Sequence, residues 1–264
     1  MSRALRTAAS GMNAQQITIE VISNNIANVN TTAFKKNKAE FQDLMYQQVA
    51  VNSIQSSIPG TQTTTENRIQ VGNGVQTAST QKIFQQGDIV ATNNELDLAI
   101  QGEGFFQLRR PDGSFAYTRD GSFQISADGS IITSSGLAVE PGLSLNSEVL
   151  SIKINREGSV EVQEVGGATV TLGNIQLVRF MNNGGLIPLG DNLYAESPSS
   201  GQPMYGNPGS SGFGEVVQGY LESSNVDIVE EMIAMITAQR AYEINSKTVK
   251  TVEDMMTMAN NLKR

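Results

Sequence analysis

Both ends of the chain repeat apolar residues at intervals of seven, and this spacing constrains the fold more than any other feature of the sequence. At the N-terminus the repeat contains no proline, and Gly11 is its single glycine. A heptad repeat of this length predicts a helix whose apolar seam needs a partner. Asn and β-branched residues at 28–32 predict its end. The main row consists of Leu5, Met12, Ile19 and Ile26, and the intermediate row of Ala8, Gln15, Ile22 and Val29.

The last forty residues have the same design. Two helices with matching heptads at opposite ends of one chain predict that the helices pair with each other in a coiled-coil-like inner domain. The alternative is that each helix packs separately on a globular core. The main row consists of Ile228, Met235, Tyr242, Val249 and Met256, with Ile233 on the same apolar side, and the second row of Glu231, Ala238, Asn245, Val252 and Ala259.

The middle of the chain has the pattern of short β-strands. Three Asp-Gly-Ser triplets begin at Asp112, Asp120 and Asp128, eight residues apart. Asp-Gly favours hairpin turns, because glycine supplies the positive φ that these turns require. Alternating apolar residues between the triplets predict an antiparallel sheet or a small barrel.

These elements together predict an α+β fold in which the helices enclose the β structure in sequence. Residues 1–30 and 226–264 form the helical inner domain, residues 31–84 and 201–225 the connecting segments, and residues 85–200 the β-rich outer domain. Residues 47–73, within the first connecting segment, form a polar insertion rich in Gln, Ser and Thr. Composition alone favours a flexible linker there.

The composition removes most catalytic chemistry. The 264 residues include no His, Cys or Trp, which excludes an imidazole base, a thiolate nucleophile and the usual zinc ligands. The sequence around Gly102 and Gly104 lacks the third glycine of a nucleotide-binding fingerprint. Each Asp-Gly-Ser triplet offers one carboxylate where a calcium loop needs several. A carboxylate pair for glycoside hydrolysis stays open. The sequence predicts no enzyme, no cofactor and no metal.

Charge and hydropathy exclude two further classes of protein. The net charge is −8, and the excess of acidic residues lies in the middle of the chain, which argues against a nucleic-acid partner. No apolar run approaches the roughly 20 residues needed to cross a bilayer, so we expect no membrane span. The basic start, with Arg3 and Arg6, is not followed by the apolar stretch of a secretory signal.

Two motifs resemble the signatures of the bacterial flagellar rod and hook (axial) family. Residues 23–35, SNNIANVNTTAFK, resemble its N-terminal signature, with Ala33 where the family usually has glycine. Residues 239–247, QRAYEINSK, resemble its C-terminal signature. Further pieces at 100–107, 116–123, 192–194 and 219–226 resemble the distal rod branch of the family. The resemblance marks Asn24, Asn25, Ile26, Ala27, Asn28, Asn30, Thr31, Phe34 and Lys35 at one end, and Gln239, Arg240, Tyr242, Glu243 and Asn245 at the other.

The resemblance implies a self-assembling structural subunit of the flagellar basal body. In this family the terminal helices pair and form the inner tube of a hollow shaft, with the β domain outside. The distal rod spans the periplasm and transmits torque to the hook. The implied partners are copies of the chain, proximal rod proteins, the hook protein, the P- and L-ring proteins, and the flagellar type III export apparatus. The insertion at 47–73 would lie between neighbouring subunits and keep the shaft straight.

Other functions remain open on the sequence alone. One alternative is a proximal rod or hook-type subunit, which is the same class of protein. Another is a secreted β-rich adhesin or glycan-binding protein that uses its helical ends to form multimers, and a third is a wall-cleaving enzyme.

Overall fold

The computed structural model describes residues 2–50, 68–142, 144, 149–164 and 168–262, and the chain divides into two compact units. Unit 1 comprises Met1–Ile26, Asn37–Gln81 and Ile228–Arg264, and unit 2 comprises Ala27–Lys36 and Lys82–Asp227. The chain therefore crosses between the units four times, after residues 26, 36, 81 and 227.

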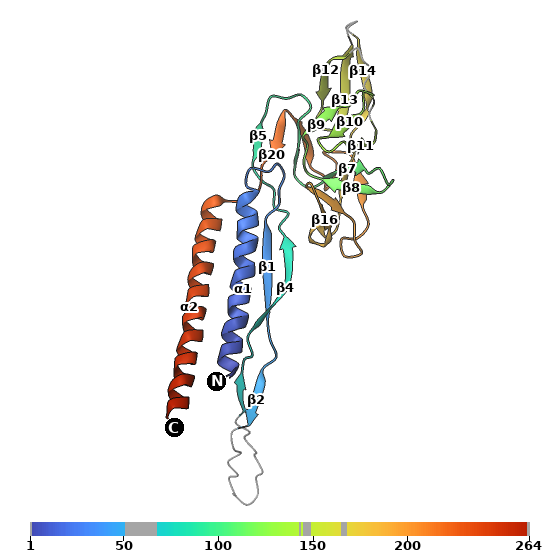
Figure 1. Cartoon of the computed structure of the whole chain (residues 1–264). Coiled ribbons are helices and arrows are strands. Elements are labelled where there is room, and N and C mark those ends of the chain that lie inside the picture. Colours follow the sequence, from blue (N-terminus) through green and yellow to red (C-terminus); the bar gives the residue numbers. More distant parts are fainter. Residues whose placement is uncertain (1, 51–67, 143, 145–148, 165–167, 263–264) are drawn as a thin grey trace, which may run out of the picture. The chain divides into compact units, whose positions relative to one another are not determined.

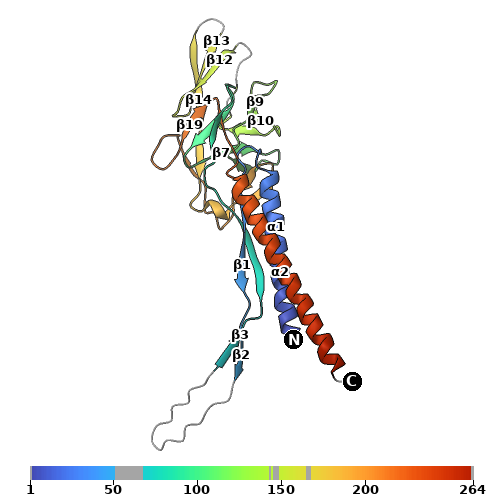
Figure 2. The same ribbon diagram turned by 90° about the vertical axis from the view of Figure 1, so that its left-hand side faces the viewer.

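Unit 1 contains two long helices, as the heptads predict. They are α1 (Ser2–Ala27) and α2 (Ile228–Asn261). The helices run side by side, and the start of α1 and the end of α2 lie at the same end of this unit, so the helices are antiparallel (Figures 1 and 2). Glu230 and Glu231 occupy the first turn of α2, where the helix dipole favours negative charge.

Two pairs of strands complete unit 1. Strand β1 (Asn37–Asp43) pairs with β4 (Val75–Lys82), and β2 (Gln47–Ala50) pairs antiparallel with β3 (Arg68–Val71). The ends of the polar insertion at 47–73 are thus strands, where composition alone favours a linker. The rest of the insertion, residues 51–67, lies outside the described residues.

The described part of unit 2 consists of short strands and one turn of 3₁₀ helix, η1 (Asn183–Gly185). The strands in chain order are β5 (Ile89–Ala91), β6 (Leu98–Gln101), β7 (Phe105–Arg109), β8 (Phe115–Thr118), β9 (Phe123–Ile125), β10 (Ile131–Thr133), β11 (Ala138–Glu140), β12 (Val149–Ile154), β13 (Ser159–Glu164), β14 (Thr169–Asn174), β15 (Leu177–Arg179), β16 (Ile187–Gly190), β17 (Leu193–Ala195), β18 (Met204–Gly206), β19 (Glu215–Gln218) and β20 (Tyr220–Glu222).

The largest sheet of unit 2 is antiparallel and open, which resolves the choice between a sheet and a barrel. Its main path runs β16-β17-β8-β7-β11-β10-β9, and β15 joins β7 to β18. Within the described residues, the two end strands of this path do not pair with each other. Strands β12, β13 and β14 form a separate sheet, and β6 with β19 and β5 with β20 form two ladders.

Strand β7 shows how the sequence builds the core on both faces of this sheet. Adjacent side chains on a strand point to opposite faces. Phe106 packs in the main apolar cluster with Phe123, whereas Phe105 packs in a second cluster with Tyr117 and Tyr194. The two adjacent phenylalanines of β7 therefore both enter the core, one on each face of the sheet.

The middle Asp-Gly-Ser triplet is not the hairpin turn that its sequence suggests. Strand β8 pairs with β7 and β17, and β9 pairs with β10, so Asp120 and Gly121 do not join two paired strands. The oxygen of Gly121 accepts a hydrogen bond from Leu98 N–H at 3.1 Å. A Cβ on Gly121 would lie 1.7 Å from the oxygen of Leu98. Close approach of two backbones, and not positive φ, requires this glycine.

Candidate functional site

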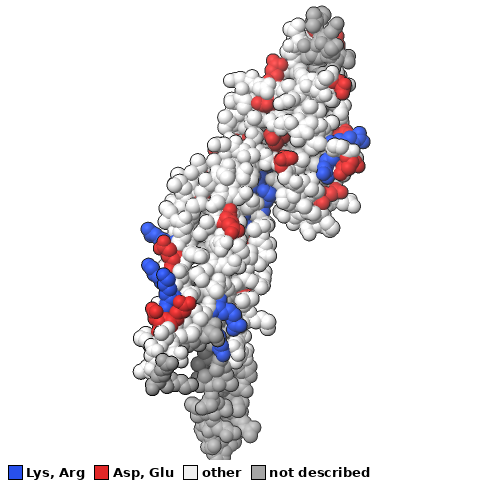
Figure 3. Space-filling view, viewed as in Figure 1, with Lys and Arg blue, Asp and Glu red and all other residues white. Residues whose placement is uncertain are grey.

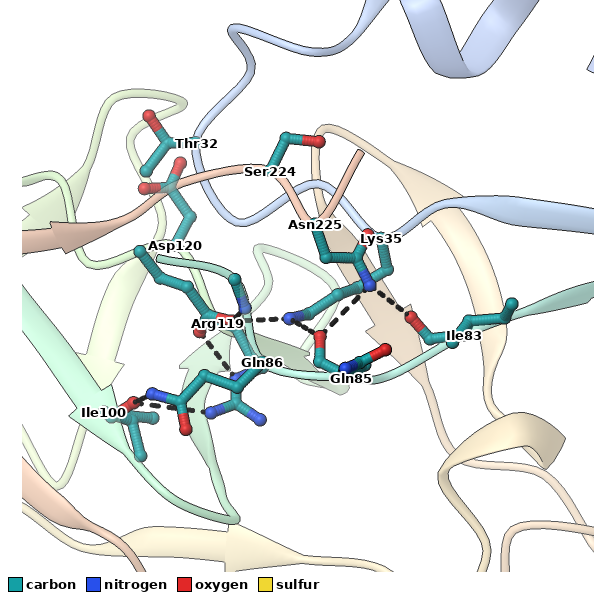
Figure 4. Close-up of polar contacts among 12 residues, drawn as sticks. Thr32, Lys35, Ile83, Gln85, Gln86, Ile100, Arg119, Asp120, Ser224 and Asn225 are labelled. Carbon is teal, nitrogen blue, oxygen red and sulfur yellow. Dashed lines mark hydrogen bonds and ion pairs between the residues drawn. The ribbon is translucent and has the colours of Figure 1, made fainter. Parts of the chain in front are cut away.

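Three charged side chains from distant parts of the chain meet in the interior of unit 2. Glu222, at the end of β20, pairs with Lys35 and with Arg119, whose Nε lies 3.0 Å from Glu222 Oε2. None of the three residues is more than 4% exposed. Figure 4 shows Lys35 and Arg119 reaching the same region from separate segments. We call Lys35, Arg119 and Glu222 the ion cluster.

Backbone groups satisfy the remaining hydrogen-bonding capacity of the ion cluster. Lys35 Nζ also donates to the oxygen of Gln85 at 2.7 Å, and Arg119 donates to the oxygen of Gly102 at 2.6 Å. The N–H of Gly87 donates to Glu222 Oε1 at 2.9 Å. Burial lowers the pKa of Lys35, and the charge of Glu222 partly opposes this shift. A buried charge is tolerated only when it is paired and hydrogen-bonded, and this cluster meets both conditions.

The residues that precede Lys35 are fixed to the same region. The N–H of Ala33 donates to the backbone oxygen of Glu222 at 2.7 Å. Ala33 has φ of +55°, in the left-handed region that favours glycine, and its side chain is buried. This conformation gives a physical reason for the glycine that the family usually has at this position. Phe34 is buried, with Lys82 Nζ 5.0 Å from its ring centroid, a cation–π contact.

Asn225 connects three segments of unit 2. Its Oδ1 accepts from the N–H of Lys36 at 2.8 Å, and its Nδ2 donates to the oxygens of Ile83 and Gln85 at 2.8 and 3.1 Å (Figure 4). One side-chain amide therefore links the end of the N-terminal signature to the segment after β4 and to the segment before α2.

Asn25 has the corresponding role in unit 1. It is 1% exposed, near the end of α1. Its Nδ2 donates to the oxygen of Asn37 at 2.9 Å and to Glu231 Oε2 at 3.2 Å, and its Oδ1 accepts from the N–H of Asn37 at 2.9 Å. This one side chain thus connects α1, β1 and α2.

The other residues of the N-terminal signature lie at the end of α1 or just after it. Ile26 is half-buried, whereas Asn24, Ala27 and Asn30 are exposed. The hydroxyl of Thr31 donates to Asn28 Oδ1 at 3.1 Å, closing the turn after the helix. Val29 lies in this turn, beyond the last residue of α1, so its assignment to the helical seam is wrong. The two asparagines beside it favour a turn over another helical residue.

The predicted seam residues inside α1 are at least partly covered. Ile22 is buried, and Leu5, Met12 and Ile19 are half-buried. Ala8 and Ala14 are buried as well. The hydroxyl of Ser10 accepts from the N–H of Val75 at 3.3 Å, so α1 also contacts β4. Because α1 contacts strands as well as α2, it buries more than one stripe.

The buried row of α2 is the second heptad row, whereas the predicted main row is exposed or half-buried in the single chain. Glu231, Ala238 and Val252 are buried and Asn245 is half-buried. Of the predicted main row, Ile228 and Tyr242 are exposed, and Met235, Val249 and Met256 are half-buried. The small or polar residues of the second row allow close approach of α1: a Cβ on Gly11 would lie 3.0 Å from Asn245 Nδ2.

A separate apolar stripe on α2 is exposed. Val229, Met232, Ile233 and Ile236 are 49–66% exposed, and their spacing of i, i+3, i+4 and i+7 places them on one face. We call these four residues the exposed stripe. The predicted signature residues Gln239, Arg240 and Glu243 are also exposed on α2. Charged side chains are sparse over much of the face in Figure 3.

Sequence reasoning missed Arg119, Glu222 and Asn225 as site residues. Arg119 and Glu222 lie beside segments of apolar and small residues, in a chain with only 17% charged residues. A charge in such a context is a signal that could have marked Arg119 and Glu222, because buried charges need partners. The pairing itself depends on long-range topology, which a single sequence does not give.

Comparison with known proteins covers both ends and the centre of the chain. Residues 5–35 match the family model described as flagella basal body rod protein, residues 99–162 match the flagellar hook protein FlgE/F/G D1 domain, and residues 217–262 match the flagellar basal body rod FlgEFG protein C-terminal family. The first and last matches contain the two signatures.

Full-length relatives give the same assignment. The chain is 48% identical to the flagellar basal-body rod protein FlgG of Borreliella burgdorferi, over 100% of both chains. It is 47% identical to FlgG of Caulobacter vibrioides, over 99% of both chains, and 38% identical to FlgG of Bacillus subtilis, over 100% of both. The chain therefore belongs to the flagellar basal-body rod protein family and is a FlgG-like structural subunit of the flagellar basal-body rod.

Proposed function

We propose that the protein forms the distal rod, the hollow shaft that transmits torque from the motor to the hook. In this proposal α1 and α2 pair and line the inner tube, and unit 2 lies outside them. The domain boundaries that follow are residues 1–30 and 226–264 for the inner tube and residues 85–200 for the outer domain. The work of the protein is packing, not catalysis.

Two contacts between α1 and α2 support coiled-coil-like pairing. Asn25 bonds to Glu231, and Gly11 lies against Asn245. Both contacts involve the second heptad row of α2, and they are fourteen residues apart in each helix. A separation of two heptads in both partners is the register that an antiparallel pair with a seven-residue repeat maintains.

The exposed stripe is the observation that carries the proposal. Glu231, Ala238 and Val252 already occupy the side of α2 that is buried, so the single chain leaves Val229, Met232, Ile233 and Ile236 in water. Burying a Val, Ile or Met side chain contributes roughly 1.5–3 kcal/mol. A second copy of the chain can supply this burial. Contacts of this kind between unlike surfaces do not close, and they generate a helical polymer.

The partners of the assembled shaft follow from its proposed place in the flagellum. They are other copies of the chain, proximal rod proteins, the hook protein and the P- and L-ring proteins, with the flagellar type III export apparatus acting before assembly. No helix within the described ranges is long and apolar enough to cross a membrane. Unit 2 carries nine basic and seventeen acidic residues and unit 1 nine of each, so the whole net charge of −8 lies on unit 2. Such a balance disfavours nucleic acid as a partner.

The polar insertion at 47–73 has a proposed role in stiffness. Placed between neighbouring subunits, it would keep the shaft straight. Deleting residues 52–66 should then give a curved or bendable rod, as judged by negative-stain microscopy. A deletion variant whose rods stay straight and stiff would remove this role.

Polymerisation of the purified chain tests the proposal. The unsubstituted chain should form helical tubes in negative stain. Ile233→Asp, in the exposed stripe, and Ile26→Asp, at the end of α1, should abolish the tubes while unit 2 keeps its circular dichroism spectrum. Leu150→Asp is the control, because Leu150 is 66% exposed on β12, in unit 2. Normal tubes from both helix variants would refute the claim that these apolar residues hold the tube together. Glycan binding by a chain that forms no tubes would favour the adhesin alternative.

A further inference from the structure

Two asparagines, one buried and one half-buried, lie close to the first and the last of the four places where the chain crosses between the two units. Asn25 lies one residue before the first crossing, and Asn225 lies two residues before the last. Each asparagine bonds within its own unit to segments that lead to other crossings.

On the unit 1 side, Asn25 connects three of the four chain segments that cross between the units. Asn25 itself lies in the segment that crosses after residue 26. Asn37 begins the segment after the second crossing, and its backbone oxygen and N–H both bond to the side chain of Asn25. Glu231, at 3.2 Å from Asn25 Nδ2, lies in the first turn after the fourth crossing.

On the unit 2 side, Asn225 connects the segments of the second, third and fourth crossings, two of which Asn25 also connects. Lys36 is the last residue before the second crossing, and its N–H donates to Asn225 Oδ1. Ile83 is the second residue after the third crossing, and its oxygen accepts from Asn225 Nδ2. The backbone adds two bonds here, from Ile83 N–H to the oxygen of Lys36 at 2.9 Å and from Asn225 N–H to the oxygen of Phe34 at 3.3 Å.

The chemistry of both positions requires an amide. A side-chain amide donates two hydrogen bonds and accepts through its oxygen, and Asn25 and Asn225 each use both functions. An Asp at either position could accept but could not donate. At residue 25 it would also place a second carboxylate beside Glu231.

We propose that Asn25 and Asn225 act as two clamps that hold the crossing segments together, Asn25 within unit 1 and Asn225 within unit 2. A load that passes from one unit to the other is then shared among connected segments instead of acting on each segment separately. The proposal rests on the proposed function, because only a torque-transmitting shaft applies such a load. Both residues are positioning residues that act through the strands they connect.

The test uses the absence of cysteine from the chain. Cysteines introduced at the exposed positions Glu253, in α2, and Glu157, in unit 2, can carry spin labels without a competing thiol. The labelled chain is diluted into polymer of unlabelled chain, so that each measured distance lies within one subunit. Pulsed electron resonance then gives the width of the distance distribution.

We expect Asn25→Ala and Asn225→Ala each to widen this distribution at least twofold, and to raise amide exchange at residues 36–38 and 83–85 at least tenfold. Asn225→Asp, which keeps the acceptor, should give an intermediate width. The controls are Asn13→Ala and Asn174→Ala, which change exposed asparagines in unit 1 and unit 2 and should leave the width unchanged.

Two results would overturn the clamps. One is an unchanged width in polymers that contain the Ala variants. The other is failure of folded Ala variants to enter the polymer, because that would place both residues in the assembly surface instead. The unsubstituted chain separates the two proposals: if it forms no polymer, the proposed function fails and the torque role of the clamps fails with it.

Discussion

Lys35 and Glu222 are 187 positions apart in the sequence, yet they form an ion pair whose side chains are both 0% exposed. The pair, with Arg119, makes the end of the N-terminal signature part of the interior of unit 2. The signature therefore contributes to two units: Asn25 belongs to the helical unit, and residues 33–35 to the β unit.

Removing the carboxylate of the ion cluster should cost more stability than removing one of its cations. Glu222→Gln leaves the charges of Lys35 and Arg119 buried without an ionic partner, whereas Lys35→Met leaves the Arg119–Glu222 pair intact. Loss of one partner from a buried pair costs about 3–5 kcal/mol. We expect Glu222→Gln to reach that range and Lys35→Met to cost less, in urea unfolding followed by circular dichroism.

The partly exposed pair of Arg109 and Glu140 provides the control for this comparison. Arg109 is 60% exposed in its side chain, and exposed pairs contribute about 0–1 kcal/mol. Arg109→Met should therefore change the free energy of unfolding by less than about 1 kcal/mol. If Glu222→Gln were equally mild, the ion cluster would not stabilise unit 2.

Ala33 should tolerate glycine and reject a β-branched residue. The left-handed conformation costs an L-residue roughly 1–2 kcal/mol, which glycine avoids, while loss of one buried methyl costs about 0.8 kcal/mol. Ala33→Gly should leave stability unchanged or raise it by up to about 1 kcal/mol, and Ala33→Val should lower it. Thermal unfolding measures both. Ala99→Gly, at a buried strand position, is the matched control and should destabilise.

The contact between Gly11 and Asn245 should appear as coupling in a double-mutant cycle. Replacing glycine by alanine inside a helix gains about 1 kcal/mol when there is room. At Gly11 the new Cβ would lie 3.0 Å from Asn245 Nδ2, so the gain should be small until Asn245→Ala makes space. We expect a coupling energy of at least about 0.5 kcal/mol. Gln239→Ala, at an exposed position on α2, should show no coupling with Gly11→Ala. Zero coupling between Gly11→Ala and Asn245→Ala would contradict the observed contact.

Stability of unit 2 should fall in alkaline solution. Burial raises the pKa of Tyr117 and of Tyr194. Below about pH 10 both residues are protonated in the folded and unfolded states, so they add no pH dependence. Above it the unfolded chain loses protons first, and stability should fall by up to about 1.4 kcal/mol per pH unit for each tyrosine. The lowered pKa of Lys35 acts in the opposite direction and cannot cause this loss.

Tyrosine absorbance during alkaline unfolding checks this expectation. Tyr117→Phe and Tyr194→Phe should each flatten the decline above pH 10, after allowance for their effect at neutral pH. Tyr220→Phe, at an exposed position, should not. A decline that none of these variants alters would assign the alkaline sensitivity to other groups.

The sequence predicted the elements that depend on local periodicity. The heptads placed both terminal helices, and the alternation between turns placed the antiparallel β region. Heptad spacing gave two candidate rows on α2 but not which of them is buried in the single chain. Hydrophobicity ranks Ile228 and Tyr242 above Ala238 and Asn245, whereas contact with α1 favours small side chains that allow close approach. The Asp120-Gly121 pair misled for a related reason, since glycine permits close backbone contact as well as positive φ.

The candidate site depended on information that local patterns do not contain. Family resemblance marked Asn25 and Lys35 but gave neither residue a partner. Heptad spacing placed Glu231 in the second row of α2 without giving it a partner, and its bond to Asn25 explains its burial. Arg119, Glu222 and Asn225 meet their partners across 17 to 189 residues of sequence, which only the folded topology brings together.

A density map of the polymer formed by the full chain would show directly how the subunits pack. We expect α1 and α2 to form the inner wall of a hollow tube, with Val229, Met232, Ile233 and Ile236 packed against a neighbouring subunit and unit 2 outside. A map in which these four side chains face solvent, or in which unit 2 lines the channel, would contradict it.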